Sequence, residues 1–207
     1  MADCEMTIDS GIATMTMNRP EARNALSMEM RSEMDRLFHE AEFDDAIRCI
    51  VLEGAGDHFM AGGDVKNMHE YLGSHGPAET QAYFLHRIHA LHTIMFSMRR
   101  MPKPIVAKVR GAAAGAGVSV AAACDLVMAE ESAFFTLAYC NIGTTPDGSS
   151  SFHLPRAIGI KRVASARSHP VINQRAAGAG IKGQQPLIAF DPGNIPHAAK
   201  IKHRDRA

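Results

Sequence analysis

The sequence lacks tryptophan, an excess of either charge and any long apolar run. Its 22 lysine and arginine residues balance 22 aspartate and glutamate residues, so we expect neither a nucleic acid nor an anionic membrane as a partner. The four cysteines share no spacing typical of metal sites, which favours reduced thiols. No apolar run is long enough to insert into a membrane, and the first ten residues show no signal peptide. These absences predict a soluble, cytoplasmic protein.

The remaining pattern is that of an α/β protein. A length of 207 residues is enough for one domain with a sizeable core. Short strand patterns at 12–17, 47–52 and 102–109 alternate with helical patterns at 27–40 and 78–98. Such alternation predicts an α/β fold with parallel strand pairing.

The character of the sequence changes after residue 163. Residues 164–207 follow neither the period of a strand nor that of a helix, and they contain four glycines and four prolines. Proline breaks helices because it lacks an N–H group and clashes with the preceding turn. We therefore divide the chain into a core, residues 1–163, and an atypical, irregular tail, residues 164–207.

Two glycine turns carry the strongest functional signal. The turns are Ala61–Asp64 and Ala114–Gly117, and each follows a predicted strand. A turn with so few side chains lets a ligand approach the backbone closely, and the N-terminus of a following helix favours negative charge. If the N–H groups of the two turns converge, they form an oxyanion hole for a carbonyl oxygen that becomes an enolate. Close helix packing is the simpler explanation of either turn alone.

Several segments, in this order, resemble the crotonase (enoyl-CoA hydratase/isomerase) superfamily. They are NRPEARNALS, HFMAGGDVK, PKPIVAKVRGAAAGAGVSVAAACDLVMA, AFFTLAYCNIGTTPDG and LPRAIGIKR. The resemblance covers about residues 5–163. It implies a ClpP/crotonase-like spiral of ββα units, assembled as a homotrimer or hexamer. It also implies an acyl-CoA thioester substrate, as in fatty acid metabolism, with coenzyme A as part of the substrate, no permanently bound cofactor and no metal.

The same resemblance assigns roles to individual residues. The backbone N–H groups of Gly63 and Ala116 would hold the thioester oxygen. The residues that would line the coenzyme A site are Arg23, Ala25, Ala61, Asp64, Val65 and Gly115.

The sequence departs from the classical hydratases at the two catalytic glutamates. Ser119 and Tyr139 stand at those positions, and neither side chain is a base for water near neutral pH. Asp147 instead matches the acidic position of dienoyl-CoA isomerases and of 4-halobenzoyl-CoA dehalogenases, although Pro-Asp-Gly is also ordinary turn chemistry. His92 falls near the histidine that activates water in the dehalogenases. Isomerisation is the preferred hypothesis and dehalogenation the alternative, with Asp147 and His92 as its catalytic residues.

A third hypothesis comes from the C-terminus. The family continues after residue 163 with helices that close the acyl pocket, and nothing in residues 164–207 resembles them. The abrupt change suggests a truncated or altered C-terminal helical region, through a frameshift or alternative splicing. Such a chain could be a catalytically silent protein that binds coenzyme A or another subunit. A metal site at His86, His89 and His92 is not expected, because no carboxylate or cysteine completes the set.

Overall fold

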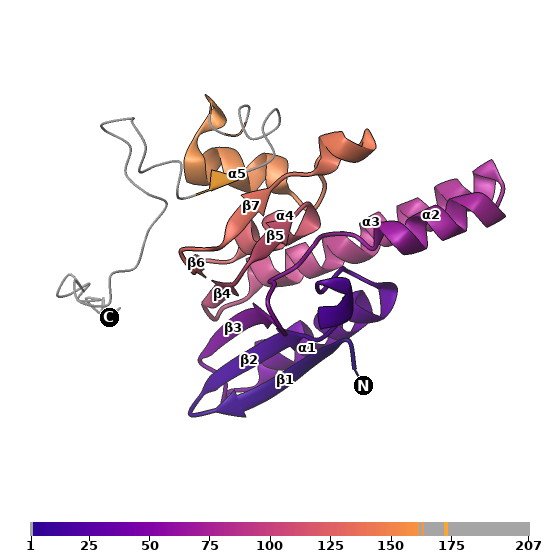
Figure 1. The fold of residues 1–207 in the computed structure, drawn as a ribbon. Coiled ribbons are helices and arrows are strands. Elements are labelled where there is room, and N and C mark those ends of the chain that lie inside the picture. Colours follow the sequence, from indigo (N-terminus) through magenta and orange to yellow (C-terminus); the bar gives the residue numbers. More distant parts are fainter. Residues whose placement is uncertain (1, 162, 164–171, 174–207) are drawn as a thin grey trace, which may run out of the picture.

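The computed structural model describes residues 2–161, 163, 172 and 173 (Figure 1). The elements are β1 (Cys4–Asp9), β2 (Ile12–Met17), η1 (Pro20–Ala22), α1 (Met28–Phe43), β3 (Cys49–Gly54), α2 (Val65–Ser74), α3 (Pro77–Arg100), β4 (Ile105–Val109), β5 (Ala112–Ala114), α4 (Ala116–Ala123), β6 (Leu126–Ala129), β7 (Phe134–Thr136), η2 (Tyr139–Ile142), α5 (Ser150–Ile158) and β8 (Ile172–Asn173). Apart from β8, the tail predicted to be irregular lies outside the described residues. Among the described helices, none has the length and apolar character needed to cross a membrane.

The strands form two sheets. The first has the order β1-β2-β3-β4-β6, in which β1 and β2 are an antiparallel hairpin and every other pair is parallel. The second has the order β5-β7-β8. The predicted α/β class with parallel pairing is therefore confirmed.

The element boundaries differ from the predictions for local reasons. The strand expected at 47–52 runs from Cys49 to Gly54, because the Ile47 N–H closes a turn onto the Asp44 carbonyl oxygen. The strand expected at 102–109 begins only at Ile105, since prolines at 102 and 104 have no N–H to donate to a sheet. Helix α2 was not expected; it begins where the Asp64 carboxylate accepts a hydrogen bond from the Asn67 N–H at 3.1 Å.

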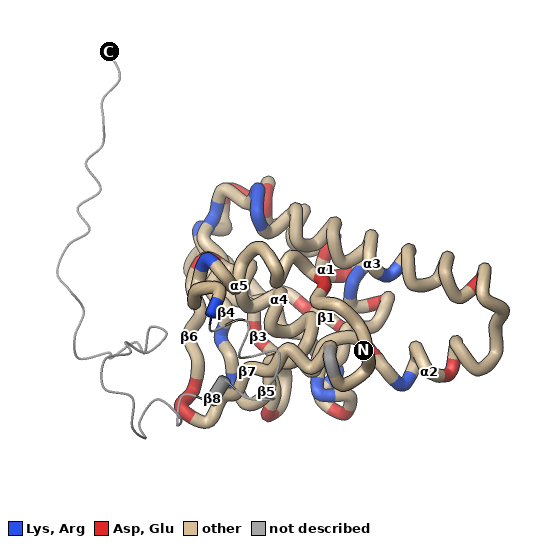
Figure 2. Tube along the Cα trace, turned by 90° about the horizontal axis from the view of Figure 1, so that it is seen from above, with Lys and Arg blue, Asp and Glu red and all other residues tan. Residues whose placement is uncertain are grey.

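The core lies between the first sheet and helices α1 and α3. Side chains of β2 alternate between buried and partly exposed, and α1 buries a stripe of residues three and four apart. Methionine fills many of the core positions, as its unbranched chain allows: Met15, Met17, Met30, Met34, Met60, Met95 and Met98 are almost fully buried. Helices α2 and α3 continue beyond this body as a projecting arm (Figures 1 and 2).

Asn24 holds the loop before α1 against the rest of the molecule. Its side chain is fully buried and its φ is 55°. The amide oxygen accepts a hydrogen bond from the Arg19 N–H at 2.9 Å, and the amide nitrogen donates to the carbonyl oxygens of Ala55 and His58 at 2.9 and 2.8 Å. One side chain thus satisfies three backbone groups that would otherwise be unpaired.

Backbone contacts also join the second sheet to the chain segment that follows β3. Met60 pairs with Ala113 in a parallel bridge, with the Ala114 N–H donating to the Met60 carbonyl oxygen at 2.9 Å. A Cβ atom at Gly117 would clash with that same oxygen. A Cβ atom at Gly62, whose φ is 98°, would lie 2.8 Å from the Ala114 carbonyl oxygen. Glycine at both positions therefore permits direct backbone packing.

Replacing Asn24 by alanine should destabilise the protein strongly. The change leaves two carbonyl oxygens and one N–H group without their partner, so we expect a loss of about 3 kcal/mol in the free energy of unfolding. Chemical denaturation measures it. Asn18→Ala is the control, because Asn18 makes an exposed hydrogen bond to Glu5, and it should cost less than about 1 kcal/mol. Equal losses in the two variants would contradict the role given to Asn24.

Replacing Gly117 by alanine should separate two backbone segments that now touch. We expect a loss of about 2 kcal/mol in the free energy of unfolding, because the new methyl group overlaps the Met60 carbonyl oxygen. Gly73→Ala is the matched control: nothing lies within 4 Å of a Cβ atom there, and alanine in helix α2 should stabilise by up to about 1 kcal/mol. A Gly117→Ala protein as stable as the parent would refute the tight packing.

Candidate active site

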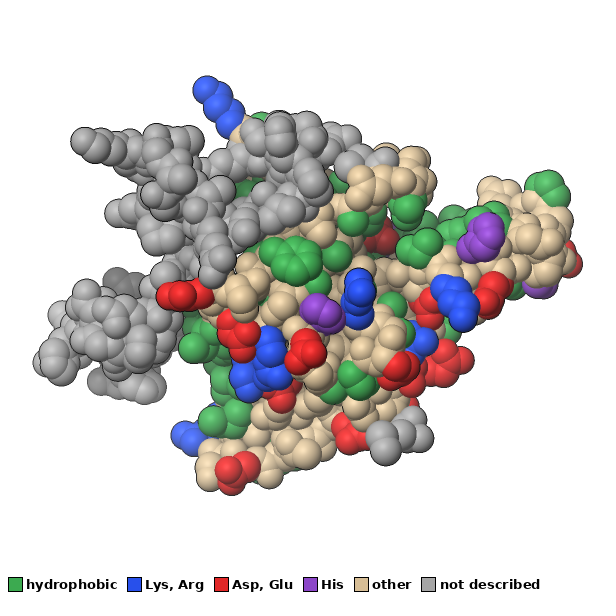
Figure 3. Space-filling model, viewed as in Figure 1, with side chains coloured by type: hydrophobic (Ala, Val, Ile, Leu, Met, Phe, Trp, Pro, Cys, Tyr) green, Lys and Arg blue, Asp and Glu red, His purple; other side chains and the backbone are tan. Residues whose placement is uncertain are grey.

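A large cavity adjoins both glycine turns. Its volume is about 670 Å³. Its walls come from the two turns, from α2 and α3, and from residues 138–147. Figure 3 shows a hollow, with hydrophobic side chains around it, between the arm of α2 and α3 and the body of the molecule. An apolar cavity with a few polar groups is the usual form of a ligand site.

The backbone of both turns contributes to the cavity wall. Gly63 and Ala116 each line it, and a Cβ atom at Gly62 would lie 3.3 Å from the Ala116 nitrogen. Ala116 is the first residue of α4, so its N–H has no partner within the helix. Within the described part of the chain, no backbone hydrogen bond outside the regular elements uses either N–H. Both donors are therefore available to a ligand in the cavity.

Three side chains that the sequence singled out meet at the same cavity. The Tyr139 hydroxyl donates a hydrogen bond to Oδ1 of Asp147 at 2.6 Å, and the Ser119 hydroxyl donates to the Asp147 backbone carbonyl oxygen at 2.9 Å. The two hydroxyl oxygens are 3.1 Å apart. Ser119 is fully buried, whereas Tyr139 and Asp147 line the cavity. Ser119 and Tyr139, which stand where the resemblance places the glutamates of hydratases, thus both donate hydrogen bonds to Asp147.

The environment keeps Tyr139 protonated. Burial raises the pKa of the phenol well above its ordinary value, and the charge of Asp147 together with its hydrogen bond raises it further. A phenol that stays protonated is a hydrogen-bond donor and not a base. Among the described residues that line the cavity, Asp147 is the only carboxylate. Asp147 is therefore the candidate base among the described residues that line this cavity.

The residues assigned to the coenzyme A site divide into two groups. Three of them line the cavity: Ala61, Val65 and Gly115. The other three, Arg23, Ala25 and Asp64, are not among the residues that line it. Arg23 is exposed, and its carbonyl oxygen accepts from the Ala61 N–H at 2.9 Å. The Ala25 carbonyl oxygen accepts from Arg19 at 2.6 Å, and the Asp64 carboxylate pairs with the same guanidinium at 3.1 Å. Burial alone would raise the pKa of Asp64, but hydrogen bonds from Asn67 and Arg19 outweigh it and lower the pKa.

His92 lies outside the cavity wall. It is half-buried on α3, whose contribution to the wall comes from Phe84, Arg87 and Ile88. In the part of the chain that the structure describes, no cluster of three or more histidine, cysteine, aspartate or glutamate side chains could hold a metal ion. The geometry thus brings Asp147 and the two turns together and leaves His92 apart from them.

The sequence analysis missed two arginines of this site. Arg31 and Arg87 line the cavity and are only 4% and 3% exposed. The sequence does contain a signal for Arg87. It lies within the helical stripe of Phe84, Ile88 and Leu91, and therefore on a face predicted to be buried. A charged residue within an apolar stripe is the informative exception to the rule that charges are exposed.

Comparison with known proteins gives the chain a family. Residues 7–180 match the model described as enoyl-CoA hydratase/isomerase. Over 155 residues the chain is 35% identical to the 1,2-epoxyphenylacetyl-CoA isomerase of Escherichia coli (strain K12), covering 75% of this chain and 58% of that protein. Over 153 residues it is 36% identical to 4-chlorobenzoyl coenzyme A dehalogenase-2 of Arthrobacter sp, covering 73% and 54%. The chain therefore spans less than two thirds of these curated relatives.

Solved structures agree with the sequence match. The crystal structure of an enoyl-CoA hydratase from Polaromonas sp. JS666 is similar with a TM-score of 0.74 and 32% identity, covering 84% of this chain and 66% of that one. The names of these three proteins give three different reactions, so the similarity does not single out one activity. The family match ends at residue 180 and thus passes residue 163, so the predicted boundary at 163 stays a prediction. Fold and sequence together show that this chain belongs to the enoyl-CoA hydratase/isomerase family and has the crotonase fold.

Proposed function

We propose that this protein moves a double bond in an acyl-CoA thioester, with Asp147 as acid and base. The N–H groups of Gly63 and Ala116 would hold the thioester oxygen. The observation that carries the proposal is the 2.6 Å hydrogen bond from Tyr139 to Oδ1 of Asp147, in the wall of the cavity that both turns share. It fixes one carboxylate oxygen and leaves proton transfer to the other.

The reaction needs one base and one oxyanion hole. Asp147 removes a proton from C2 of a 3-enoyl thioester, and the electrons of that C–H bond form the enolate. Negative charge then develops on the thioester oxygen, where two backbone N–H groups stabilise it. Asp147 returns the proton to C4, and the double bond moves from C3–C4 to C2–C3. One carboxylate thus serves as base and then as acid.

Hydration and dehalogenation receive less support. Hydration requires activated water, and neither Ser119 nor the protonated Tyr139 is a base for it. A relative at 36% identity is named as a 4-chlorobenzoyl coenzyme A dehalogenase, and Asp147 could attack an aromatic ring. The expected water-activating His92, however, is not among the residues that line the cavity.

A homotrimer or hexamer remains the expected assembly from the family resemblance.

Asp147→Asn should abolish isomerisation while leaving binding intact. Asparagine keeps the shape and the backbone carbonyl that Ser119 uses, but it cannot accept the C2 proton. We expect kcat to fall about 10³-fold. The assay incubates 3-enoyl, 2-enoyl, dienoyl and 4-chlorobenzoyl thioesters in deuterated water and follows double-bond position and deuterium uptake by mass spectrometry, and calorimetry measures binding.

The control and the contrary outcomes of this experiment are distinct. Asp45→Asn, at an exposed position, should retain full activity. Release of chloride from the 4-chlorobenzoyl thioester would favour the dehalogenase alternative. An unmodified protein that binds the thioesters but exchanges no deuterium would favour the catalytically silent alternative.

Tyr139→Phe should leave the Asp147 carboxylate in place but hold it less firmly. The variant loses the donor to Oδ1 of Asp147, so the base is less well positioned and kcat should fall about tenfold to a hundredfold. The Kd for a saturated acyl-CoA should change little. Tyr71→Phe, on the projecting arm, is the control for loss of a tyrosine hydroxyl. A Tyr139→Phe enzyme with normal kcat would show that the hydrogen bond has no part in catalysis.

A further inference from the structure

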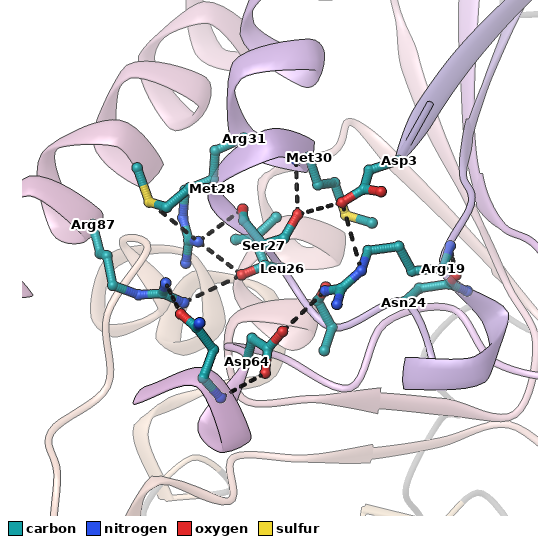
Figure 4. A network of polar contacts seen from close by, with 12 residues as sticks. Asp3, Arg19, Asn24, Leu26, Ser27, Met28, Met30, Arg31, Asp64 and Arg87 are labelled. Atoms are coloured by element: carbon teal, nitrogen blue, oxygen red, sulfur yellow. Dashed lines mark hydrogen bonds and ion pairs between the residues drawn. The ribbon is translucent and has the colours of Figure 1, made fainter. Parts of the chain in front are cut away.

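Two buried arginines that line the cavity converge on one backbone carbonyl oxygen (Figure 4). Nη1 of Arg31 donates to the Leu26 carbonyl oxygen at 2.7 Å, and Nη2 of Arg87 donates to the same oxygen at 3.3 Å. Arg31 comes from α1 and Arg87 from α3. Long-range folding, and not a local motif, therefore brings the two guanidinium groups together.

The contacts of these guanidinium groups are with neutral acceptors. Arg31 donates to the Ser27 carbonyl oxygen at 2.9 Å, and Arg87 donates to the Tyr83 hydroxyl at 2.9 Å and to the Asn67 side-chain oxygen at 3.4 Å. Among the described residues, no carboxylate lies within 4.0 Å of either group. The Nε atoms of both arginines are buried without a hydrogen-bond partner.

This arrangement is electrostatically unfavourable while no anion pairs closely with the two arginines. Burial, and then the positive charge of Arg87, lower the pKa of Arg31 to about 10, against the attraction of Asp147 and Asp64. Buried charges in proteins are normally paired. Here two of the same sign adjoin a cavity. An anion that enters the cavity would compensate both charges.

We propose that the acyl group of the substrate carries a second carboxylate, which binds between Arg31 and Arg87. This inference rests on the proposed function, because it places the anion on the acyl chain of a bound thioester. Guanidinium groups present planar, paired donors that match a carboxylate. The apolar Phe84 and Ile88 flank Arg87 in the cavity wall, where they would contact the methylene groups between the thioester and the carboxylate.

The acyl group is a better source of the anion than coenzyme A itself. The arginines share their cavity with Gly63, Ala116 and Asp147, where the reacting end of the thioester would bind. The phosphates of coenzyme A are separated from the thioester by the pantetheine arm. A carboxylate a few methylene groups from the thioester carbonyl therefore fits this wall more directly.

The test compares two thioesters that differ at one group. Glutaryl-CoA and pentanoyl-CoA have the same number of acyl carbons, with a carboxylate in the first where the second has a methyl group. Calorimetry with the whole 207-residue chain should show tighter binding of glutaryl-CoA by about tenfold to a hundredfold, as expected for hydrogen bonds to a charged group. Arg87→Met should reduce the preference to about threefold or less.

Further variants keep the test independent of folding. Arg87→Lys retains the charge and loses the paired donors, and it should show an intermediate preference. Arg36→Met is the matched control on α1, because Arg36 makes an exposed ion pair with Glu40, and it should keep the full preference. The wild-type preference itself decides the proposal if Arg87→Met does not fold.

The contrary results separate the two proposals. Binding of pentanoyl-CoA as tightly as glutaryl-CoA by the wild type would overturn the carboxylate site and leave the acyl-CoA function standing. Failure of both thioesters to bind would overturn both proposals. If free coenzyme A binds and loses as much affinity as glutaryl-CoA in Arg87→Met, the arginines recognise a phosphate and the carboxylate proposal is wrong.

Discussion

The site depends on direct backbone packing between two segments that are far apart in sequence. Met60 pairs with Ala113, and glycine at positions 62 and 117 removes the side chains that would separate them. This packing places two glycine turns in the wall of one cavity. Because the N–H groups of Gly63 and Ala116 belong to the backbone, the proposed oxyanion hole does not depend on the identity of the side chains around it.

Polar side chains support the first glycine turn and Asp147. Asn24 ties the loop before α1 to the segment after β3, and the Leu26 N–H then bonds to the Gly62 carbonyl oxygen at 2.7 Å. On the other side, Ser119 and Tyr139 hold Asp147 through its backbone and its carboxylate. Precise catalytic geometry requires such support, and under the proposed function Ser119 and Tyr139 supply part of it.

The sequence predicted the parts of this site that have a local signature. Glycine turns after strands, an acidic residue in Pro-Asp-Gly and the exchange of two glutamates for Ser119 and Tyr139 are all readable from spacing and resemblance. The hydrogen bond between Tyr139 and Asp147 could not be predicted from the sequence, because it joins η2 to a loop whose path depends on tertiary packing. The buried arginines illustrate the same limit: Arg87 could be placed on an apolar face of α3, but its neighbour Arg31 belongs to another helix.

Charge relates Asp147 to the two buried arginines. Burial lowers the pKa of Arg31, the charge of Arg87 lowers it as well, and the charge of Asp147 opposes both effects. The proposed anionic acyl group would add a second negative charge beside these arginines when the substrate is bound. A cavity with one carboxylate and two arginines would, under these proposals, use the charge of its substrate to select it and leave proton transfer to the carboxylate.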